Sequence, residues 1–244
     1  MSGGQGSGKT TIGKILKIIL KIKFGLNVVC FSLDDFYKTL SERKKMSQKI
    51  HKLFLTRGVP GTHDTKLLKS TLLKLKKKNF KSLSIPVFDK SKDDRKNKKR
   101  WLKITKKPEI IIFEGWCLGA INQKKKDLIK PINTLERKYD KQMIWRNKVN
   151  YELKNKYMKI FKLIDKLIFL KVPNFKYVLK WRILQEKKLK LNSSGKNTMS
   201  PKKIKEFVMH YERTSKQMIR NLDKLSNITI SLDRKHRFSK ITLN

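Results

Sequence analysis

Apolar residues recur at helical spacing along much of the chain, with polar residues between them. In the first such stretch, isoleucines and leucines between Ile12 and Ile22 repeat every three or four residues until Gly25 ends the pattern. The predicted helices are this stretch, residues 38–54, the leucine-rich run after its cap Asp64, residues 133–164, residues 175–189, and a helix that starts at Ser200–Pro201 and ends near Leu222.

Short apolar runs lie between these helices and predict strands at 27–33, 82–89, 108–116, 166–172 and 227–233. The run 108–116 is apolar throughout its centre, as expected of a strand buried on both faces of a sheet. Strands that alternate with helices predict an α/β fold with a mainly parallel sheet flanked by helices. The remaining segments 57–64, 90–100 and 190–199 are predicted loops.

The chain has 244 residues, of which 38% are hydrophobic, enough for one sizeable core. We therefore predict a single domain over residues 1–244, with a helical lid at about 182–200 that includes a flexible loop at 190–199. The apolar content excludes a wholly disordered chain, and no apolar run reaches the ~18 residues of a membrane span. With no secretory leader expected and only Cys30 and Cys117 as cysteines, the protein is predicted to be cytoplasmic, with reduced thiols.

The net charge is +43, from 62 Lys and Arg against 19 Asp and Glu. Such a charge is typical of nucleic-acid-binding proteins. Here, however, the chain has 51 Lys and a single Ala, Ala120, which points to a bias toward AT-rich codons, and the lysines are spread over every segment. A nucleic-acid partner is therefore not favoured, and a membrane partner is not expected.

Residues 3–10, GGQGSGKT, fit the P-loop pattern G-x-x-x-x-G-K-[ST] and are followed by a predicted helix. The glycines let backbone N–H groups surround a phosphate at the helix N-terminus. Lys9 is expected to reach the β- and γ-phosphates of ATP, and the Thr10 hydroxyl to bind Mg²⁺. The predicted nucleotide-binding residues are Gly4, Gln5, Gly6, Ser7, Gly8, Lys9, Thr10 and Thr11. A P-loop normally follows a buried strand, and because one residue precedes Ser2, we expect that first strand to be absent; the alternative to a P-loop is a flexible glycine-rich terminus.

Carboxylates follow three of the predicted strands: Asp34 and Asp35, Asp89, and Glu114. The carboxyl ends of strands in an open parallel sheet face the ligand crevice. Phosphoryl transfer needs a base for the acceptor hydroxyl and oxygen ligands for the metal, and these carboxylates could supply both. Each alone could instead be a helix cap or a loop residue.

The chain carries six characteristic segments in order: SLDDFY (32–37), RGVPGTHD (57–64), PVFDKSKDDR (86–95), IIFEGWCLG (111–119), KYVLKWRILQE (176–186) and the stretch 199–218. With these segments the sequence resembles the plant-type D-glycerate 3-kinases and their bacterial and fungal relatives. These are P-loop kinases related to uridine kinase, pantothenate kinase and phosphoribulokinase. The resemblance covers nearly the whole chain. It departs at the absent first strand and in the KDDR segment, which lacks the glycines of that loop.

The resemblance implies a role for individual residues. Asp34 matches the catalytic base, Asp35 or Glu114 would support Mg²⁺ through water, and Arg182 matches an arginine of the lid that folds over the phosphates. The predicted catalytic residues are Lys9, Asp34 and Arg182. The residues on loops that line the acceptor pocket in relatives are Asp35, Tyr37, Arg57, His63, Asp64, Asp89 and Arg95. An arginine fork suits the carboxylate of a small hydroxy acid. Alternatives stay open for His63, as a loop-ordering residue, and for Arg95, as a solubilising one.

We therefore predict an ATP-dependent, Mg²⁺-using small-molecule kinase whose favoured acceptor is D-glycerate, converted to 3-phosphoglycerate. The alternatives are another acceptor of the uridine, pantothenate and phosphoribulokinase group or, supported only by the charge, a nucleic-acid-dependent ATPase. A regulatory GTPase is not favoured, because neither an N-K-x-D guanine element nor a D-x-x-G switch element occurs where it is needed. The oligomeric state stays open.

Overall fold

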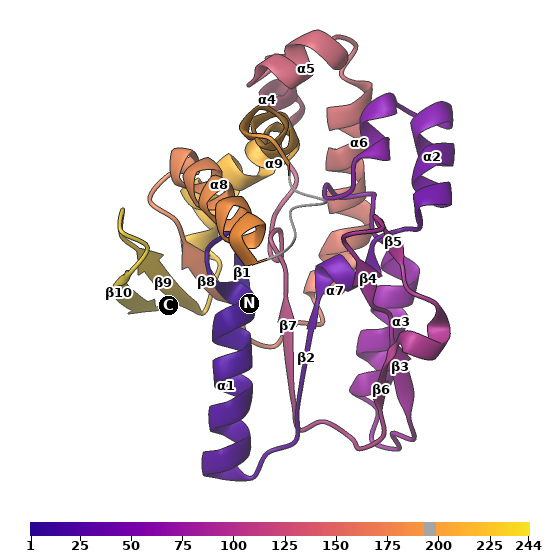
Figure 1. The fold of residues 1–244 in the computed structure, drawn as a ribbon, viewed down its shortest axis with the longest axis vertical. Helices are drawn as coiled ribbons and strands as arrows, with labels where there is room; N and C mark the ends of the chain where they lie inside the picture. The colour runs from indigo at the N-terminus through magenta and orange to yellow at the C-terminus, as the bar shows by residue number, and fades with distance from the viewer. Residues whose placement is uncertain (193–198) are drawn as a thin grey trace. The chain divides into compact units, whose positions relative to one another are not determined.

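The computed structural model describes residues 1–192 and 199–244 (Figure 1). The chain forms two compact units. The P-loop unit consists of residues 1–9, 116–147 and 166–244, and the β2–β7 unit consists of residues 10–115 and 148–165. Most of the loop predicted to be the flexible part of the lid, residues 193–198, lies outside the described residues.

A four-stranded sheet lies at the centre of the P-loop unit, in the order β1 (Ser2–Gly3), β8 (Ile168–Lys171), β9 (Ile228–Leu232) and β10 (Phe238–Leu243). The first three strands are parallel, and β10 is antiparallel to β9. The prediction that the first strand is absent needs correction, because Ser2 and Gly3 pair with Phe169 and Leu170 as a strand of two residues. The P-loop therefore does follow a strand.

The helices of the P-loop unit are α4 (Lys125–Ile129), α5 (Thr134–Tyr139), the start of α6 (Ile144–Glu152), α8 (Phe175–Asn192) and α9 (Pro201–Asn221), followed by the short turn η5 (Leu222–Lys224). α9 begins as predicted, since the Ser200 side chain accepts a hydrogen bond from the N–H of Lys203 at 3.4 Å. Its apolar face, which includes Ile204, Val208 and Met218, is buried.

Strand β10 falls outside the predicted strands. Phe238, Ile241 and Leu243 are 59%, 63% and 76% exposed, so the strand has no buried face to produce a period-two pattern. It is the last strand of its sheet, and its outer edge has no partner strand among the described residues. The open edge carries apolar side chains.

The β2–β7 unit is organised by two parallel strands, β2 (Val28–Ser32) and β7 (Ile110–Glu114), both of which were predicted. Their register pairs Ser32 with Glu114 at the carboxyl edge. Directly after Ser32 the chain forms the 3-10 turn η1 (Leu33–Phe36), which holds Asp34 and Asp35. The register thus brings the predicted carboxylates of two strands to one edge of the sheet.

The helices of this unit are α1 (Lys9–Phe24), which begins at the junction of the units, α2 (Leu40–Lys49), α3 (Thr65–Leu75) and α7 (Met158–Phe161), with the 3-10 turn η2 (Lys52–Leu55) and the π-helix η4 (Leu153–Tyr157). Asp64 caps α3 as predicted, because its carboxylate accepts the N–H of Leu67 at 3.0 Å. Leu68, Leu72 and Leu75 are buried, and each contributes about 1.5–3 kcal/mol of hydrophobic stabilisation.

The predicted strand 82–89 is wrong in its extent and its pairing. It is divided into β3 (Leu83–Ile85), antiparallel to β6 (Leu102–Ile104), and β4 (Phe88–Asp89), antiparallel to β5 (Asp94–Arg95). Pro86, which has no N–H to donate to a ladder, lies at the break. The predicted loop 90–100 accordingly contains β5 and the 3-10 turn η3 (Lys98–Arg100). Asp89 therefore does not end a strand of the parallel sheet.

Within residues 1–192 and 199–244, no helix combines the length and the hydropathy needed to cross a bilayer.

Candidate active site

The P-loop connects β1 to α1 with two glycines in the left-handed region, Gly6 at φ 76° and Gly8 at φ 92°. A Cβ placed on Gly6 would lie 3.0 Å from the Cβ of Trp181 in α8 and 3.2 Å from its carbonyl carbon. Both the backbone conformation and the close approach to α8 therefore require glycine at position 6. The loop conformation therefore depends on glycine at this position, as expected of a P-loop.

Two polar side chains of the P-loop have buried atoms without a hydrogen-bond partner among the described residues. The amide of Gln5 and the hydroxyl of Ser7 are buried without a hydrogen bond to any described residue. The Lys9 ammonium donates to the carbonyl oxygen of Gly4 at 2.9 Å, within the loop. A cradle of backbone N–H groups and unpaired polar side chains at a helix N-terminus fits the phosphates of a nucleotide.

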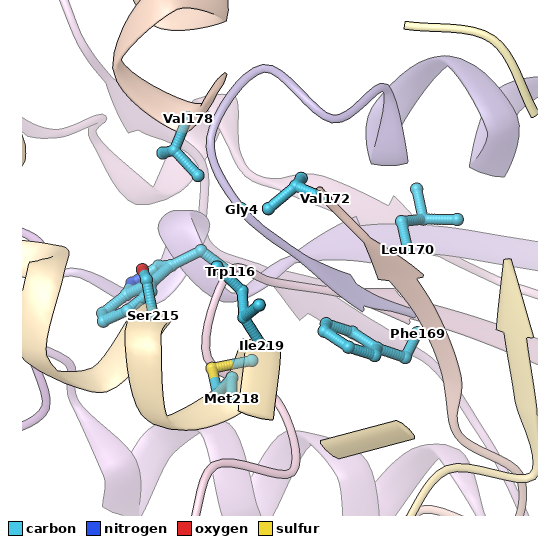
Figure 2. Close-up of a pocket in the computed structure, with 9 residues that line it drawn as sticks. All are labelled: Gly4, Trp116, Phe169, Leu170, Val172, Val178, Ser215, Met218 and Ile219. Atoms are coloured by element: carbon cyan, nitrogen blue, oxygen red, sulfur yellow. The ribbon is translucent and has the colours of Figure 1, made fainter. Parts of the chain in front are cut away.

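A small cavity lies behind the P-loop, beside Gly4 (Figure 2). Its volume is about 10 Å³, at the limit of what one water molecule needs. The side chains around it are largely apolar and include Trp116, Phe169 and Val178. This cavity is a packing defect under the loop and is too small for an acceptor.

Thr10 and Glu114, the predicted metal residues, are in contact. The Thr10 hydroxyl donates to Oε1 of Glu114 at 2.7 Å, and Glu114 is buried at the edge of β7. A hydroxyl beside a carboxylate is a ligand set that suits Mg²⁺, which binds few protein groups and takes its other ligands from water and phosphate. The described residues contain no cluster of three or more His, Cys, Asp or Glu that could hold a metal ion. Thr11, next on α1, is exposed.

Asp34 lies in η1 with a partner on each carboxylate oxygen. Oδ1 accepts from the Tyr37 hydroxyl at 3.0 Å, and Oδ2 accepts from the Lys90 ammonium at 2.7 Å. Burial by itself would raise the pKa of Asp34, but the charge and hydrogen bond of Lys90, helped by Tyr37, outweigh it and lower the pKa below its ordinary value. Asp34 is therefore ionised at neutral pH. Lys90 was not among the predicted site residues.

The neighbouring Asp35 has a different environment. Its Oδ2 accepts the N–H of Ser32 at 3.0 Å and its Oδ1 accepts the N–H of Phe88 at 3.4 Å. Burial raises the pKa of Asp35 above its ordinary value, although both backbone hydrogen bonds oppose the shift. Asp35 thus ties β2 to β4, and of the two carboxylates considered as metal support, Glu114 is the one that contacts Thr10.

Arg57 belongs to an ion cluster that the sequence did not predict. Asp93 forms ion pairs with Arg57 and with the fully buried Arg43, whose Nη2 lies 3.0 Å from Oδ2. The Arg57 guanidinium also lies over the Phe88 ring, 5.5 Å from its centroid. Asp93 has φ 52°, a left-handed conformation that aspartate tolerates better than most residues. Asp93 therefore adopts a backbone conformation that glycine would adopt without strain.

Arg95 fixes the loop that contains Tyr37. Its Nη2 donates to the Tyr37 carbonyl at 2.8 Å and lies 3.6 Å from Oδ2 of Asp64. The Arg95 side chain is 13% exposed, which is inconsistent with the alternative of a purely solubilising residue. Asp89 has a local role as well, because its Oδ1 accepts the N–H and hydroxyl of Ser91 and so forms the turn after β4.

His63 is buried, with 1% of its surface exposed. Its ring stacks on Tyr37 at a centroid distance of 4.4 Å, and Nδ1 is 2.6 Å from the Tyr157 hydroxyl. Nε2 has no hydrogen-bond partner among the described residues. Burial lowers the pKa of His63 to about 3, so the ring is neutral. This geometry fits the loop-ordering alternative, because the Tyr157 hydroxyl also accepts the N–H of Gly61 at 3.0 Å.

The predicted lid arginine, Arg182, lies in α8 of the P-loop unit. Its Nη1 is 2.5 Å from Oε2 of Glu186, one helical turn further along. Glu186 also accepts the N–H of Met199 at 2.7 Å, which connects the end of α8 to the residues before α9. Arg182 is therefore held by a residue that connects α8 to the segment before α9.

Parallel strands, a P-loop that opens a helix, and an ionised carboxylate directly after the parallel strand β2 are together typical of a P-loop kinase. Residues 1–146 match the model of the Phosphoribulokinase / Uridine kinase family, and the chain belongs to this family. It is an ATP-dependent kinase of α/β fold, as the sequence predicted.

Three similar proteins show which members of the family this chain resembles. The kinase mug58 of Schizosaccharomyces pombe is 36% identical over 219 residues, which cover 86% of this chain and 76% of the relative. The chloroplastic D-glycerate 3-kinase of Arabidopsis thaliana is 30% identical over 218 residues, which cover 86% of this chain but 45% of the plant enzyme. The solved D-glycerate 3-kinase of Cryptococcus neoformans superposes with a TM-score of 0.82 at 25% identity, covering 100% of this chain and 88% of the fungal one. The predicted family resemblance is confirmed.

Proposed function

We propose that this kinase transfers the γ-phosphate of ATP to a hydroxyl of a small anionic hydroxy acid, with D-glycerate as the acceptor and 3-phosphoglycerate as the product. One observation carries the proposal: Lys90 and Tyr37 hold Asp34 ionised directly after β2, at the sheet edge where Glu114 ends β7 and contacts Thr10 of α1. The names of the plant and fungal relatives support the choice of acceptor.

In the proposed reaction Asp34 acts as general base. It accepts the proton of the acceptor hydroxyl while the hydroxyl oxygen forms its bond to the γ-phosphorus and the bond to the bridging oxygen of ADP breaks. Lys9 and the N–H groups of the P-loop stabilise the negative charge of the phosphates. Arg182 is proposed to add its charge once it is released from Glu186.

Thr10 and Glu114 are the residues that would hold Mg²⁺. When bound, the ion would neutralise phosphate charge and orient the triphosphate. The role of the chain is to present a hydroxyl and a carboxyl oxygen at adjacent positions, which the parallel register of β2 and β7 and the first turn of α1 provide.

Cationic side chains on the acceptor loops favour an anionic acceptor over a nucleoside. The Lys90 side chain is 63% exposed and the Arg57 side chain is 21% exposed, so the ammonium of Lys90 and the guanidinium of Arg57 are both accessible to a small ligand. Arg95, Asp64 and His63 would then act indirectly, by ordering the loops.

The test is an assay of ADP release with D-glycerate, uridine, pantothenate and ribulose 5-phosphate as separate acceptors. We expect D-glycerate to give the highest kcat/KM, and product analysis to show 3-phosphoglycerate. A kcat/KM for uridine far above that for D-glycerate would refute the proposal in favour of the alternative acceptor group. A parallel measurement with added RNA or DNA tests the ATPase alternative, which predicts stimulated turnover that falls steeply with salt.

A further inference from the structure

Lys90 stands out among the basic residues of the acceptor loops because its partner is the base itself. It lies on the turn between β4 and β5, and its Nζ is 2.7 Å from Oδ2 of Asp34. The other cations near this edge have other partners: Arg43 and Arg57 pair with Asp93, and Arg95 pairs with Asp64. The charge of Asp34 raises the pKa of Lys90, which therefore stays protonated.

The two partners of Asp34 differ in how readily they can leave. Tyr37 is 2% exposed, its ring stacks on His63, and its backbone is fixed by Arg95. The Lys90 side chain is 63% exposed and that of Asp34 is 27% exposed. A solvent-accessible ion pair of this kind contributes little to stability, so its exchange costs little. Lys90 is thus the mobile partner.

An ammonium on Oδ2 also makes Asp34 a weaker base, because it stabilises the ionised form. A ligand that carries a hydroxyl and a carboxylate can reverse this effect. Its carboxylate competes with Asp34 for the ammonium, and its hydroxyl takes the released position on Oδ2. A neutral alcohol can do only the second.

We propose that Lys90 is an exchangeable counter-ion that holds Asp34 when no acceptor is bound and moves to the carboxylate of the acceptor when it binds. Lys90 is then a specificity-determining residue for anionic acceptors, an inference that rests on the proposed function. Lys90 keeps its proton throughout. The hydroxyl proton goes to Oδ2 of Asp34, the O–P bond to the acceptor forms, and the P–O bond to ADP breaks.

The first test compares D-glycerate with glycerol, in which a neutral hydroxymethyl group replaces the carboxylate. In Lys90→Met we expect kcat/KM for D-glycerate to fall about 10- to 100-fold, the loss of one hydrogen bond to a charged group, with most of the change in KM. The value for glycerol should stay the same or rise. Lys90→Arg should recover much of the preference for D-glycerate. Lys92→Met, an exposed residue two positions along the same turn, is the matched control and should behave as wild type.

The second test needs no acceptor. If Lys90 restrains the base, Lys90→Met should hydrolyse ATP faster than wild type in the absence of acceptor, and Lys90→Met combined with Asp34→Asn should lose that increase. Unchanged melting temperatures would show that the variants fold. If Lys90→Met neither alters the ratio between the two acceptors nor raises hydrolysis, the inference is overturned. If wild type does not use D-glycerate, the proposed function fails, and the hydrolysis comparison still decides the role of Lys90.

Discussion

His63 makes the stability of this protein depend on pH in a way that one substitution can isolate. The ring is 1% exposed, and burial lowers its pKa from 6.5 to about 3. The negative charge of Asp34 opposes this shift, and the positive charge of the Lys38 ammonium adds to it. Because the folded-state pKa lies below the unfolded-state pKa, the unfolded chain binds the proton first. Stability is therefore fully present above pH 6.5 and decreases as the pH falls from 6.5 toward 3.

The magnitude follows from the two pKa values. Each pH unit across this window changes the free energy of unfolding by about 1.4 kcal/mol, so the His63 contribution alone lowers stability by about 2 kcal/mol between pH 7 and pH 5. His63→Phe keeps a ring to stack on Tyr37 but removes the titrating group. At pH 7 it should cost about 1–3 kcal/mol, because the buried Tyr157 hydroxyl loses a partner.

The assay is urea unfolding of wild type and His63→Phe at pH 7, 6 and 5. We expect the difference in unfolding free energy to shrink by about 2 kcal/mol from pH 7 to pH 5. Tyr157→Phe is the control, since it removes the same hydrogen bond but keeps the histidine, and its difference from wild type should stay constant. If His63→Phe also runs parallel to wild type, the ring is accessible to protons in the folded state and the assignment of a buried neutral histidine is wrong.

Four further predictions concern the reaction, the loop after β2 and the P-loop. Lys9→Ala should abolish phosphoryl transfer, because charge stabilisation of the γ-phosphate is lost; a near-normal kcat in the purified variant would contradict the P-loop assignment. Asp34→Asn should lower kcat about 10²–10⁴-fold with nucleotide affinity nearly intact. Asp35→Asn should mainly lower the melting temperature, because the Asp35 oxygens accept two backbone N–H groups. If instead Asp35→Asn lowers kcat and Asp34→Asn mainly lowers the melting temperature, Asp35 is the base and Asp34 the structural residue. Gly6→Ala should weaken ATP binding in calorimetry, because a Cβ at φ 76° would meet Trp181 at 3.0 Å; wild-type affinity would show that the loop conformation is not required.

Features that depend on local pattern could be predicted from the sequence. The P-loop, the strands β2, β7, β8 and β9, and the caps of α3 and α9 all rest on residues within a few positions of one another. The ends of β2 and β7 could be placed together because parallel strands finish at a common edge. These elements fixed the α/β class and most of the chemistry.

Pairings between distant positions could not be predicted. Lys90 and Asp34 are 56 positions apart, and Arg43 and Asp93 are 50 apart, so nothing in the local pattern connects them. The prediction of a single strand over 82–89 is wrong for a related reason. The apolar composition of this run is the same whether it pairs with a parallel strand or with a nearby antiparallel strand. Residues that order a loop, such as His63, have the same motif signature as residues that bind a ligand.

The open edge of β10 has a consequence for handling the protein. Phe238, Ile241 and Leu243 leave this edge able to pair with a second chain, while a net charge of +43 keeps two chains apart. Salt shortens the range of that repulsion from about 10 Å at 0.1 M to about 3 Å at 1 M. Buffer of low ionic strength should therefore keep concentrated samples free of aggregates. Elution from a cation-exchange column by a salt gradient would concentrate the protein at high salt, the condition that promotes aggregation through this edge.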